Sequence, residues 1–145
     1  MPLMYLSYTE GTFTPDALNQ VVDQITRDGI SLEKLPLTPW VHSTTWVFAR
    51  EYPRAQVFHG GKSTGARGFV ALDINVIQGG YSAATKQELI KRVTDTVGKY
   101  GDLPTDEPRR VYVIIREVAE SNWGFDGQTI DLEMLRNPPE DLKPL

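Results

Sequence analysis

Hydrophobic positions in the first half of the chain predict a strand, a helix and a second strand. Residues 3–8 have the composition of a short strand, and the pair Thr14-Pro15 predicts the start of a helix with Thr14 as its N-cap. The apolar residues that follow at helical spacing are Leu18, Val21, Val22 and Ile25. After two prolines, residues 44–49 form a β-rich run that predicts the second strand.

The second half of the chain repeats this order of elements. A strand is predicted by the alternating apolar residues Val70, Leu72, Ile74 and Val76. Ser82 is expected to begin a helix, and residues 111–115 predict the last strand. The halves align with one constant offset at three pairs, Gly11 and Gly79, Phe13 and Tyr81, and Thr14 and Ser82. We therefore interpret the chain as one domain of two fused repeats, about 2–65 and 68–128, followed by a Pro-rich tail, 129–145.

Two such units predict an α+β fold. A strand–helix–strand unit requires parallel pairing through a right-handed crossover, so tandem β-α-β repeats form a four-stranded sheet with two helices on one face. Residues 69–77 and 111–115 carry apolar side chains toward both faces, which is typical of a sheet covered on both sides. Because two helices cover one face, we expect another subunit to cover the other. The tail from Asn137 is expected to be a disordered end or an arm on a neighbouring subunit.

Composition excludes several classes of function. The 145 residues carry a net charge of -4, which argues against binding nucleic acid through its phosphates. No apolar run reaches the roughly 20 residues that span a bilayer, and the first residues lack the features of a signal peptide, so we expect a cytoplasmic protein without membrane contact. The chain has no cysteine for a thiolate or disulfide, and its two histidines make a zinc enzyme unexpected. We expect no metal and no cofactor.

The ordered combination of these features resembles the tautomerase superfamily. Proline directly follows the initiator Met, a short strand leads to Glu10-Gly11 and Thr14-Pro15, and a second copy of the unit follows. Residues 74–127 are similar to a 4-oxalocrotonate tautomerase subunit, whereas residues 51–61 look more like the fused cis-3-chloroacrylic acid dehalogenase subgroup. The resemblance covers about residues 2–128. It implies the tautomerase fold doubled in one chain, a homotrimer, and the amino-terminal proline as catalyst.

The chemistry of Pro2 suits that role independently of the resemblance. If Met1 is removed, Pro2 has a free secondary amine at the start of a strand. An α-amino group has an ordinary pKa of about 7.7–8.0, and apolar surroundings lower that pKa because they disfavour the cation. The neutral amine is a general base and the protonated amine a general acid. The counterpart of Pro2 in the second repeat is Val70, so we expect one active site per chain.

The sequence departs from the family where substrate carboxylates are bound. The family's arginines after the strand and in the turn correspond to Gln78 and Tyr81, and the arginine early in the last strand corresponds to Tyr112. The histidine of the dehalogenases near the end of the first helix corresponds to Gly29. We expect Gln78 and Tyr81 to bind substrate as neutral hydrogen-bonding groups. Tyr112 is the candidate catalytic donor that stabilises developing enolate charge, within the pocket around Pro2 of its own or a neighbouring subunit.

The remaining candidate substrate-binding residues lie in the second repeat. Trp123 corresponds to the hydrophobic wall residue of the tautomerases, and Asn122 precedes it. Arg109 and Arg110 come just before the last long strand and are expected near the mouth of the site. A substrate of this chain is then either less acidic than the family's or held by other arginines, since Gln and Tyr do not replace a bidentate arginine clamp.

The function that these residues favour is a tautomerase-type isomerase. Pro2 would act as general base for keto-enol proton transfer on an unsaturated keto or 2-hydroxy acid. One alternative on the same scaffold is a hydratase or dehalogenase of unsaturated acids, with Pro2 as a cationic acid. The other is a non-catalytic trimeric protein that kept the fold, which a retained Met1 would favour because it converts the amine of Pro2 into an amide.

Overall fold

The first half of the chain folds as a strand–helix–strand unit. The structure is a computed structural model that describes residues 2–63, 65–105 and 107–145. The elements of the first unit are β1 (Leu3–Thr9), α1 (Pro15–Leu32), the short α2 (Pro39–Ser43) and β2 (Trp46–Tyr52). Thr14 caps α1 as predicted, because its side-chain oxygen accepts a hydrogen bond from the Ala17 N–H at 3.2 Å.

The second half contains a matching unit and several short elements. Its main elements are β5 (Val70–Ile77), α3 (Ala83–Tyr100) and β6 (Val111–Val118). Ser82 caps α3 and accepts a hydrogen bond from the Thr85 N–H at 3.2 Å. The short elements are η1 (Arg54–Gln56), β3 (Phe58–His59), β4 (Lys62–Ser63), η2 (Glu120–Asn122), β7 (Gly124–Phe125), β8 (Gln128–Thr129) and α4 (Leu132–Arg136).

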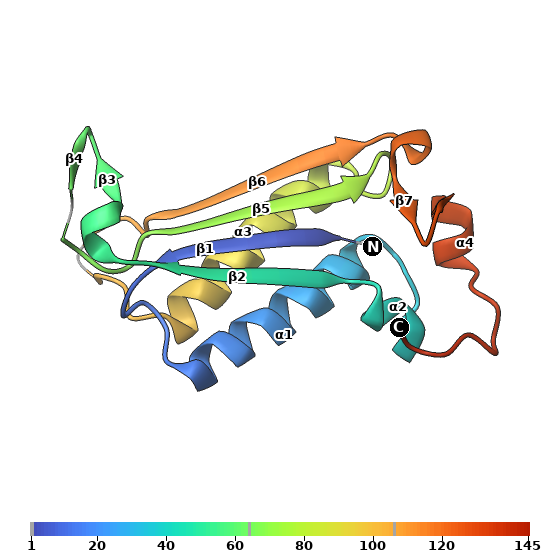
Figure 1. The fold of residues 1–145 in the computed structure, drawn as a ribbon, viewed down its shortest axis with the longest axis horizontal. Helices are drawn as coiled ribbons and strands as arrows, with labels where there is room; N and C mark the ends of the chain where they lie inside the picture. Colours follow the sequence, from blue (N-terminus) through green and yellow to red (C-terminus); the bar gives the residue numbers. More distant parts are fainter. Residues whose placement is uncertain (1, 64, 106) are drawn as a thin grey trace.

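The two units join into one four-stranded sheet with the order β2-β1-β5-β6 (Figure 1). Each unit pairs its own strands in parallel, and the units meet through the antiparallel pair of β1 and β5, in which Leu3 lies opposite Asn75. Helices α1 and α3 pack side by side on one face (Figure 1). This arrangement confirms the predicted α+β fold class. The antiparallel junction places the start of β1 beside the end of β5.

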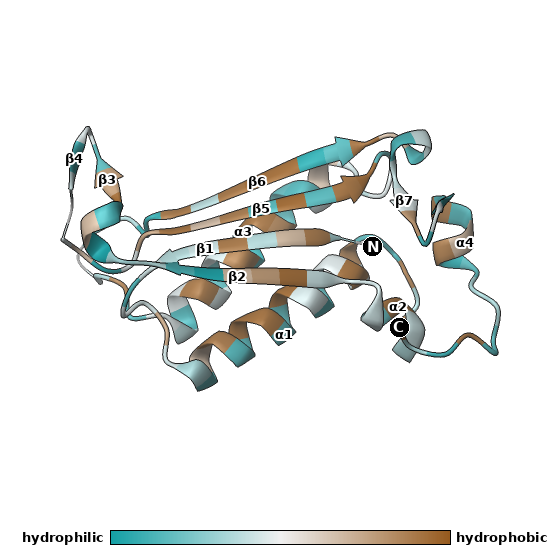
Figure 2. Cartoon of the chain, viewed as in Figure 1, coloured by the Kyte–Doolittle hydropathy of each residue, from teal (hydrophilic) through white to brown (hydrophobic). Residues whose placement is uncertain are grey.

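The main core lies between the sheet and the two long helices. Alternate residues of the central strands point into it, including Met4 and Leu6 of β1 and Leu72 and Ile74 of β5. In Figure 2 hydrophobic and hydrophilic segments alternate along α1, as expected for a helix with one face against a sheet. Buried helical residues complete this core, and they are Val21, Ile25, Leu89, Val93 and Val97.

A second hydrophobic cluster lies at the end of the molecule where β1 begins. Its buried members are Ile30, Leu35, Trp40, Val41, Ile77, Trp123, Ile130, Leu132 and Leu135. The last residues return to this end, because the Leu145 N–H donates to Ser43 Oγ at 2.9 Å and Leu142 packs against the cluster. Within the chain, the tail from Asn137 therefore contacts the end of the molecule where β1 begins, through Leu142 and the backbone of Leu145.

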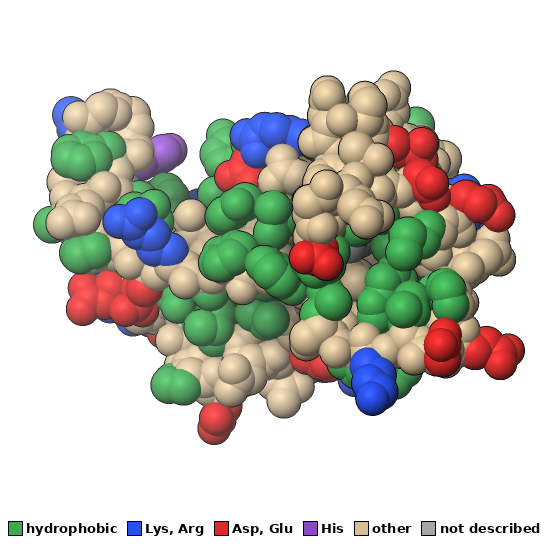
Figure 3. Space-filling model, turned by 45° about the vertical axis from the view of Figure 1, so that its right-hand side comes forward, with side chains coloured by type: hydrophobic (Ala, Val, Ile, Leu, Met, Phe, Trp, Pro, Cys, Tyr) green, Lys and Arg blue, Asp and Glu red, His purple; other side chains and the backbone are tan. Residues whose placement is uncertain are grey.

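The sheet face opposite the helices is exposed and aromatic. The register places the side chains of Tyr5, Phe48 and Ile114 on this face, with Trp46 and Tyr112 toward its two ends, and all five are exposed. Tyr5 and Phe48 stack with ring centroids 5.5 Å apart. Hydrophobic side chains also gather in the centre of the surface in Figure 3. None of the helices in the described residues is long and apolar enough to cross a membrane.

Candidate active site

Pro2 is buried at the start of β1, against the last turns of α1. Its carbonyl oxygen accepts a hydrogen bond from the Trp46 N–H at 3.4 Å, which ties the end of the chain to β2. Its ring lies close to Gly29, since a Cβ on that glycine would be 3.1 Å from Pro2 Cγ and 2.9 Å from Met4 Cε. The predicted removal of Met1 concerns a residue outside the described part of the chain.

Tyr81 reaches the same place from the turn between β5 and α3. Its hydroxyl donates a hydrogen bond to the Gly29 carbonyl at 2.6 Å, and the side chain is only 4% exposed. Burial raises the pKa of Tyr81, and the negative charge of Glu33 raises this pKa further. The phenol therefore stays protonated, and its proton is directed at Gly29. The structure places Tyr81 beside Pro2, with its hydroxyl proton already used within the protein.

Glu33 is a buried acidic residue at the end of α1 that the sequence pattern did not reveal. It is 0% exposed and follows α1 directly, four residues after Gly29. Its carboxyl group fits against Gly80, where a Cβ would be 2.6 Å from Glu33 Oε1. The available signal was its spacing, because Ile25, Gly29 and Glu33 follow one another at intervals of four and share one face of the helix. A charged residue at a helix end is otherwise typical of a solvated surface.

A cavity of about 330 Å³ opens at this end of the sheet, and we call it the proximal cavity. Leu3, the neighbour of Pro2, lines it. Its aromatic wall is made by Trp46, Trp123 and Phe125, with the rings of Trp46 and Phe125 in an edge-to-face arrangement at 6.4 Å. The remaining lining residues are Thr44, Asn75, Val118, Asn122 and Gly124. No Lys or Arg is among these described residues, so the proximal cavity by itself suits an apolar or amide-recognised group.

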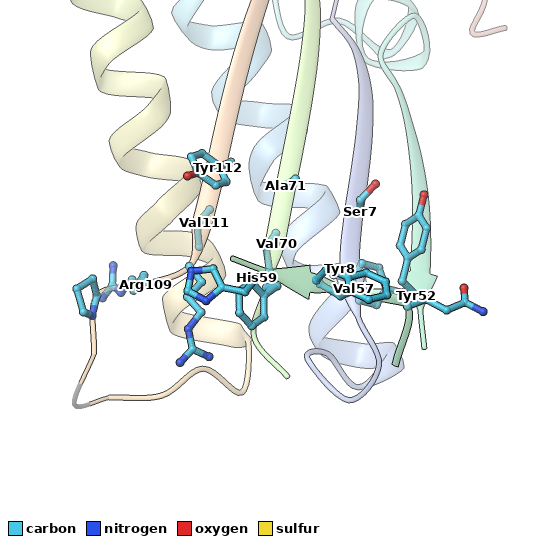
Figure 4. A pocket seen from close by; sticks show the side chains of 15 residues that line it. Ser7, Tyr8, Tyr52, Val57, His59, Val70, Ala71, Arg109, Val111 and Tyr112 are labelled. Carbon is cyan, nitrogen blue, oxygen red and sulfur yellow. The ribbon is translucent and has the colours of Figure 1, made fainter. Parts of the chain in front are cut away.

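A second cavity of about 680 Å³ lies at the opposite end of the sheet, and we call it the distal cavity (Figure 4). Tyr112 and Arg109 line it from β6 and the loop before it, together with Arg110. Tyr112 pairs with Ala71 and that residue with Ser7, near the end of β1, so Tyr112 lies several strand residues away from Pro2. Within one chain the predicted catalytic tyrosine and both predicted arginines are therefore separated from Pro2.

The arginines of the distal cavity already have partners within the chain. Arg109 Nη1 lies 2.7 Å from Asp95 Oδ1 on α3. Arg110 forms an ion pair with Glu107, and its guanidinium carbon lies 4.8 Å from the centroid of the Phe69 ring. Both side chains remain partly exposed, so these contacts hold them near the cavity without burying them.

The structure thus places the predicted site residues at three locations. The structure brings Tyr81, Asn122 and Trp123 to the end of the sheet that holds Pro2. Gln78 is exposed beyond the end of β5, where its N–H donates to the Val118 carbonyl at 2.8 Å, and it does not line the proximal cavity. Tyr112, Arg109 and Arg110 form the group at the distal cavity.

Comparison with protein families identifies one match. Residues 71–132 match the family described as Tautomerase enzyme, which corresponds to the second strand–helix–strand unit and the elements after it. None of the curated proteins compared with the chain matches it in sequence.

Solved structures show the fold over nearly the whole chain. A wild-type fused 4-OT, solved as a symmetric trimer, is similar with a TM-score of 0.72 and 19% identity, over 88% of this chain and 94% of that chain. N1, a member of the cis-3-chloroacrylic acid dehalogenase family, gives a TM-score of 0.72 and 19% identity, over 89% of this chain and 83% of that chain. RhCC from Rhodococcus jostii RHA1 gives a TM-score of 0.66 and 18% identity, over 88% and 84%. The family match and the shared fold confirm the resemblance to the tautomerase superfamily.

Proposed function

We propose that this chain, a tautomerase superfamily protein with the tautomerase fold, is a tautomerase-type isomerase with Pro2 as its general base. The observation that carries the proposal is the position of Pro2. It is buried at the start of β1 against Gly29, and the next residue, Leu3, lines the proximal cavity. A catalytic amine requires such a site, in which substrate can approach while bulk water is limited.

The proposed reaction moves one proton within an unsaturated keto or 2-hydroxy acid. Once Met1 is removed, the neutral amine of Pro2 takes a proton from the enol hydroxyl group or from the carbon next to the carbonyl. The electron pair moves along the conjugated system, and the Pro2 ammonium returns the proton to another carbon. No bond to another group forms or breaks and no electrons leave the substrate, so the step needs no cofactor.

The carboxylate of such a substrate requires a partner that the proximal cavity of one chain does not supply. We propose that a homotrimer completes the site, with Arg109, Arg110 and Tyr112 of a neighbouring subunit brought to Pro2. The exposed aromatic face of the sheet around Tyr5 and Phe48 supports assembly, since isolated soluble chains rarely leave large apolar patches open. A fused 4-OT with the same fold was solved as a trimer.

A second candidate is a hydratase or dehalogenase of unsaturated acids in which the protonated Pro2 is the acid. The similarity to N1 of the cis-3-chloroacrylic acid dehalogenase family supports this second candidate. The support is as strong as that which the similarity to the fused 4-OT gives to the isomerase. Against it stands Gly29, the counterpart of the dehalogenase histidine. A Cβ there would already crowd Pro2 and Met4, so this backbone has no room for a water-activating side chain.

Activity assays on wild type and Pro2→Ala test the proposal. We expect an ultraviolet assay to detect ketonisation of phenylenolpyruvate or 2-hydroxymuconate, with a large loss of rate in Pro2→Ala. Pro144→Ala, in the exposed tail, is the matched control and should keep wild-type activity. Turnover of 3-chloroacrylate without tautomerisation would favour the second candidate. An intact mass that retains Met1, together with no turnover of either substrate class, would favour the non-catalytic trimer.

A further inference from the structure

The proximal cavity combines an aromatic wall with an uncharged lining. Trp46, Trp123 and Phe125 form the wall from β2, the residue after η2 and β7, and the rings of Trp46 and Phe125 meet edge to face at 6.4 Å. The indole N–H of Trp46 donates to the Ser43 carbonyl at 3.1 Å, so the hydrogen-bond donor of this side chain is already used. The wall therefore presents ring faces and edges, the surfaces that pack favourably against another aromatic ring.

The polar side chains of the proximal cavity are neutral, and two of them already donate within the chain. Asn75 Nδ2 donates to the Leu3 carbonyl at 3.3 Å, and Thr44 Oγ1 donates to the Val41 carbonyl at 2.7 Å. Asn122 is exposed. None of the described lining residues is Asp, Glu, Lys or Arg. A carboxylate placed here would lose water without gaining a cation, which costs free energy.

Arg116 lies beside this cavity in the sheet, and an acidic residue of β5 balances its charge. It pairs with Asn75 in the parallel register of β5 and β6. Its Nη1 lies 2.6 Å from Asp73 Oδ1, and both side chains are partly exposed. The pair carries no net charge, so it does not turn the proximal cavity into a site for an anion.

The distal cavity is the structural counterpart of the proximal cavity in the other repeat, and its chemistry differs. Val57 follows η1 as Trp123 follows η2, and His59 ends β3 as Phe125 ends β7. Both counterparts line the distal cavity, which also holds the two partly exposed arginines described above (Figure 4). The pair of Trp123 and Phe125 thus belongs to the cavity beside Pro2, and the cations belong to the other cavity. In the proposed trimer the arginines would bind the carboxylate of a substrate and the aromatic wall its other end.

We propose that the proximal cavity binds an aromatic ring of the substrate, and that the substrate class is an aryl-substituted enol or keto acid with a single carboxylate. This inference rests on the proposed role of Pro2. The volume of about 330 Å³ is sufficient for one ring. A ring buried here gains apolar and edge-to-face contacts, whereas the second carboxylate of a substrate such as 2-hydroxymuconate would be buried without a cation.

The first test measures binding without turnover, by isothermal titration calorimetry with two unreactive probes. 3-Phenylpropionate has one carboxylate and a ring, whereas adipate has two carboxylates on a chain of similar length. We expect 3-phenylpropionate to bind wild type about tenfold more tightly than adipate. Pro2→Ala should keep this preference, because the aromatic wall is unchanged. Equal affinity for the two probes, or no binding of 3-phenylpropionate, would overturn the inference.

The second test adds the missing cation to the proximal cavity. Asn122→Arg, at an exposed lining residue, should increase the affinity for adipate relative to 3-phenylpropionate by about tenfold. The ratio of kcat/KM for 2-hydroxymuconate to that for phenylenolpyruvate should increase with it. Asn19→Arg, exposed on α1, is the matched control, because it adds the same charge away from the cavity and should leave both ratios unchanged.

The two proposals fail separately. An unchanged ratio of probe affinities in folded Asn122→Arg would overturn the ring site, and the preference of wild type decides the question if this variant does not fold. Full activity in Pro2→Ala removes the proposed function, whereas the probes report on the proximal cavity without any reaction.

Discussion

The hydroxyl of Tyr81 donates a 2.6 Å hydrogen bond to the carbonyl oxygen of Gly29. These residues lie 52 positions apart and come from different repeats, so this contact fixes α1 against the turn before α3. A side chain at residue 29 would enter the space that Pro2, Met4 and the Tyr81 hydroxyl share. Glycine at this position therefore leaves room for Pro2 and Met4, and the hydrogen bond from Tyr81 fixes the adjacent end of α1.

Removing the Tyr81 hydroxyl should destabilise the protein moderately. Tyr81→Phe loses one buried hydrogen bond, while the Gly29 carbonyl keeps the bond from the Glu33 N–H. We expect the free energy of unfolding to decrease by about 1 kcal/mol, measured by urea denaturation. Tyr112→Phe is the matched control, because that side chain is 77% exposed and should not change the stability of the monomer. An equal effect of both substitutions would contradict this assignment.

Adding one methyl group at residue 29 should impair catalysis. In Gly29→Ala the Cβ would lie 3.1 Å from Pro2 Cγ and 2.9 Å from Met4 Cε, so the ring of Pro2 must move. We expect a decrease in kcat/KM of about 10- to 100-fold, because small displacements of a catalytic group are costly. Overpacking should also lower the stability by about 1–3 kcal/mol.

The matched control for this substitution is another helical glycine. In Gly98→Ala the new Cβ meets the flexible end of the Arg109 side chain, which has room to move because it is partly exposed. We expect stability equal to or above that of wild type, since alanine favours helix over glycine by about 1 kcal/mol. Wild-type activity in Gly29→Ala would show that the ring of Pro2 does not need its present position.

Tyr112→Phe tests the completion of the site by a neighbouring subunit. If the Tyr112 hydroxyl stabilises enolate charge at a neighbour's Pro2, its loss should raise the activation free energy by about 2–4 kcal/mol and leave the fold intact. Steady-state kinetics with circular dichroism as a control for folding measures this. An unchanged rate would leave Tyr112 as an exposed residue of the distal cavity without a role in the reaction.

A charge on the open sheet face should dissociate the expected trimer. Light scattering of wild type should give a mass near three times 16.3 kDa. Phe48→Asp, in the middle of the exposed aromatic face, should give a monomer, because the interface would bury an unpaired carboxylate. Ile90→Asp, at an exposed position of α3, is the control and should remain trimeric. A stable wild-type monomer at micromolar concentration would refute the argument from the open face.

Local pattern was sufficient for the two long helices and the four strands of the main sheet. Capping residues with the correct spacing, Thr14 and Ser82, placed the starts of both long helices, since a cap acts within its own first turn. The alternation of residues along β5 and β6 indicated which side chains point toward the helices, because successive side chains of a strand point to opposite faces of the sheet. Duplication of this pattern then predicted an α+β fold with one four-stranded sheet and two helices on one face.

The composition of the site was decided by tertiary structure. The sequence alone determined that Pro2 begins a strand, that the two halves repeat one unit and that arginines are missing where the family has them. Only the antiparallel pairing of β1 with β5 separated Tyr112 from Pro2 within the chain. Only the packing of Tyr81 against α1 brought its hydroxyl to the glycine that Pro2 also contacts. The physical reason is range: periodicity reports which face of an element is buried, whereas the register between distant elements depends on how all the faces pack together.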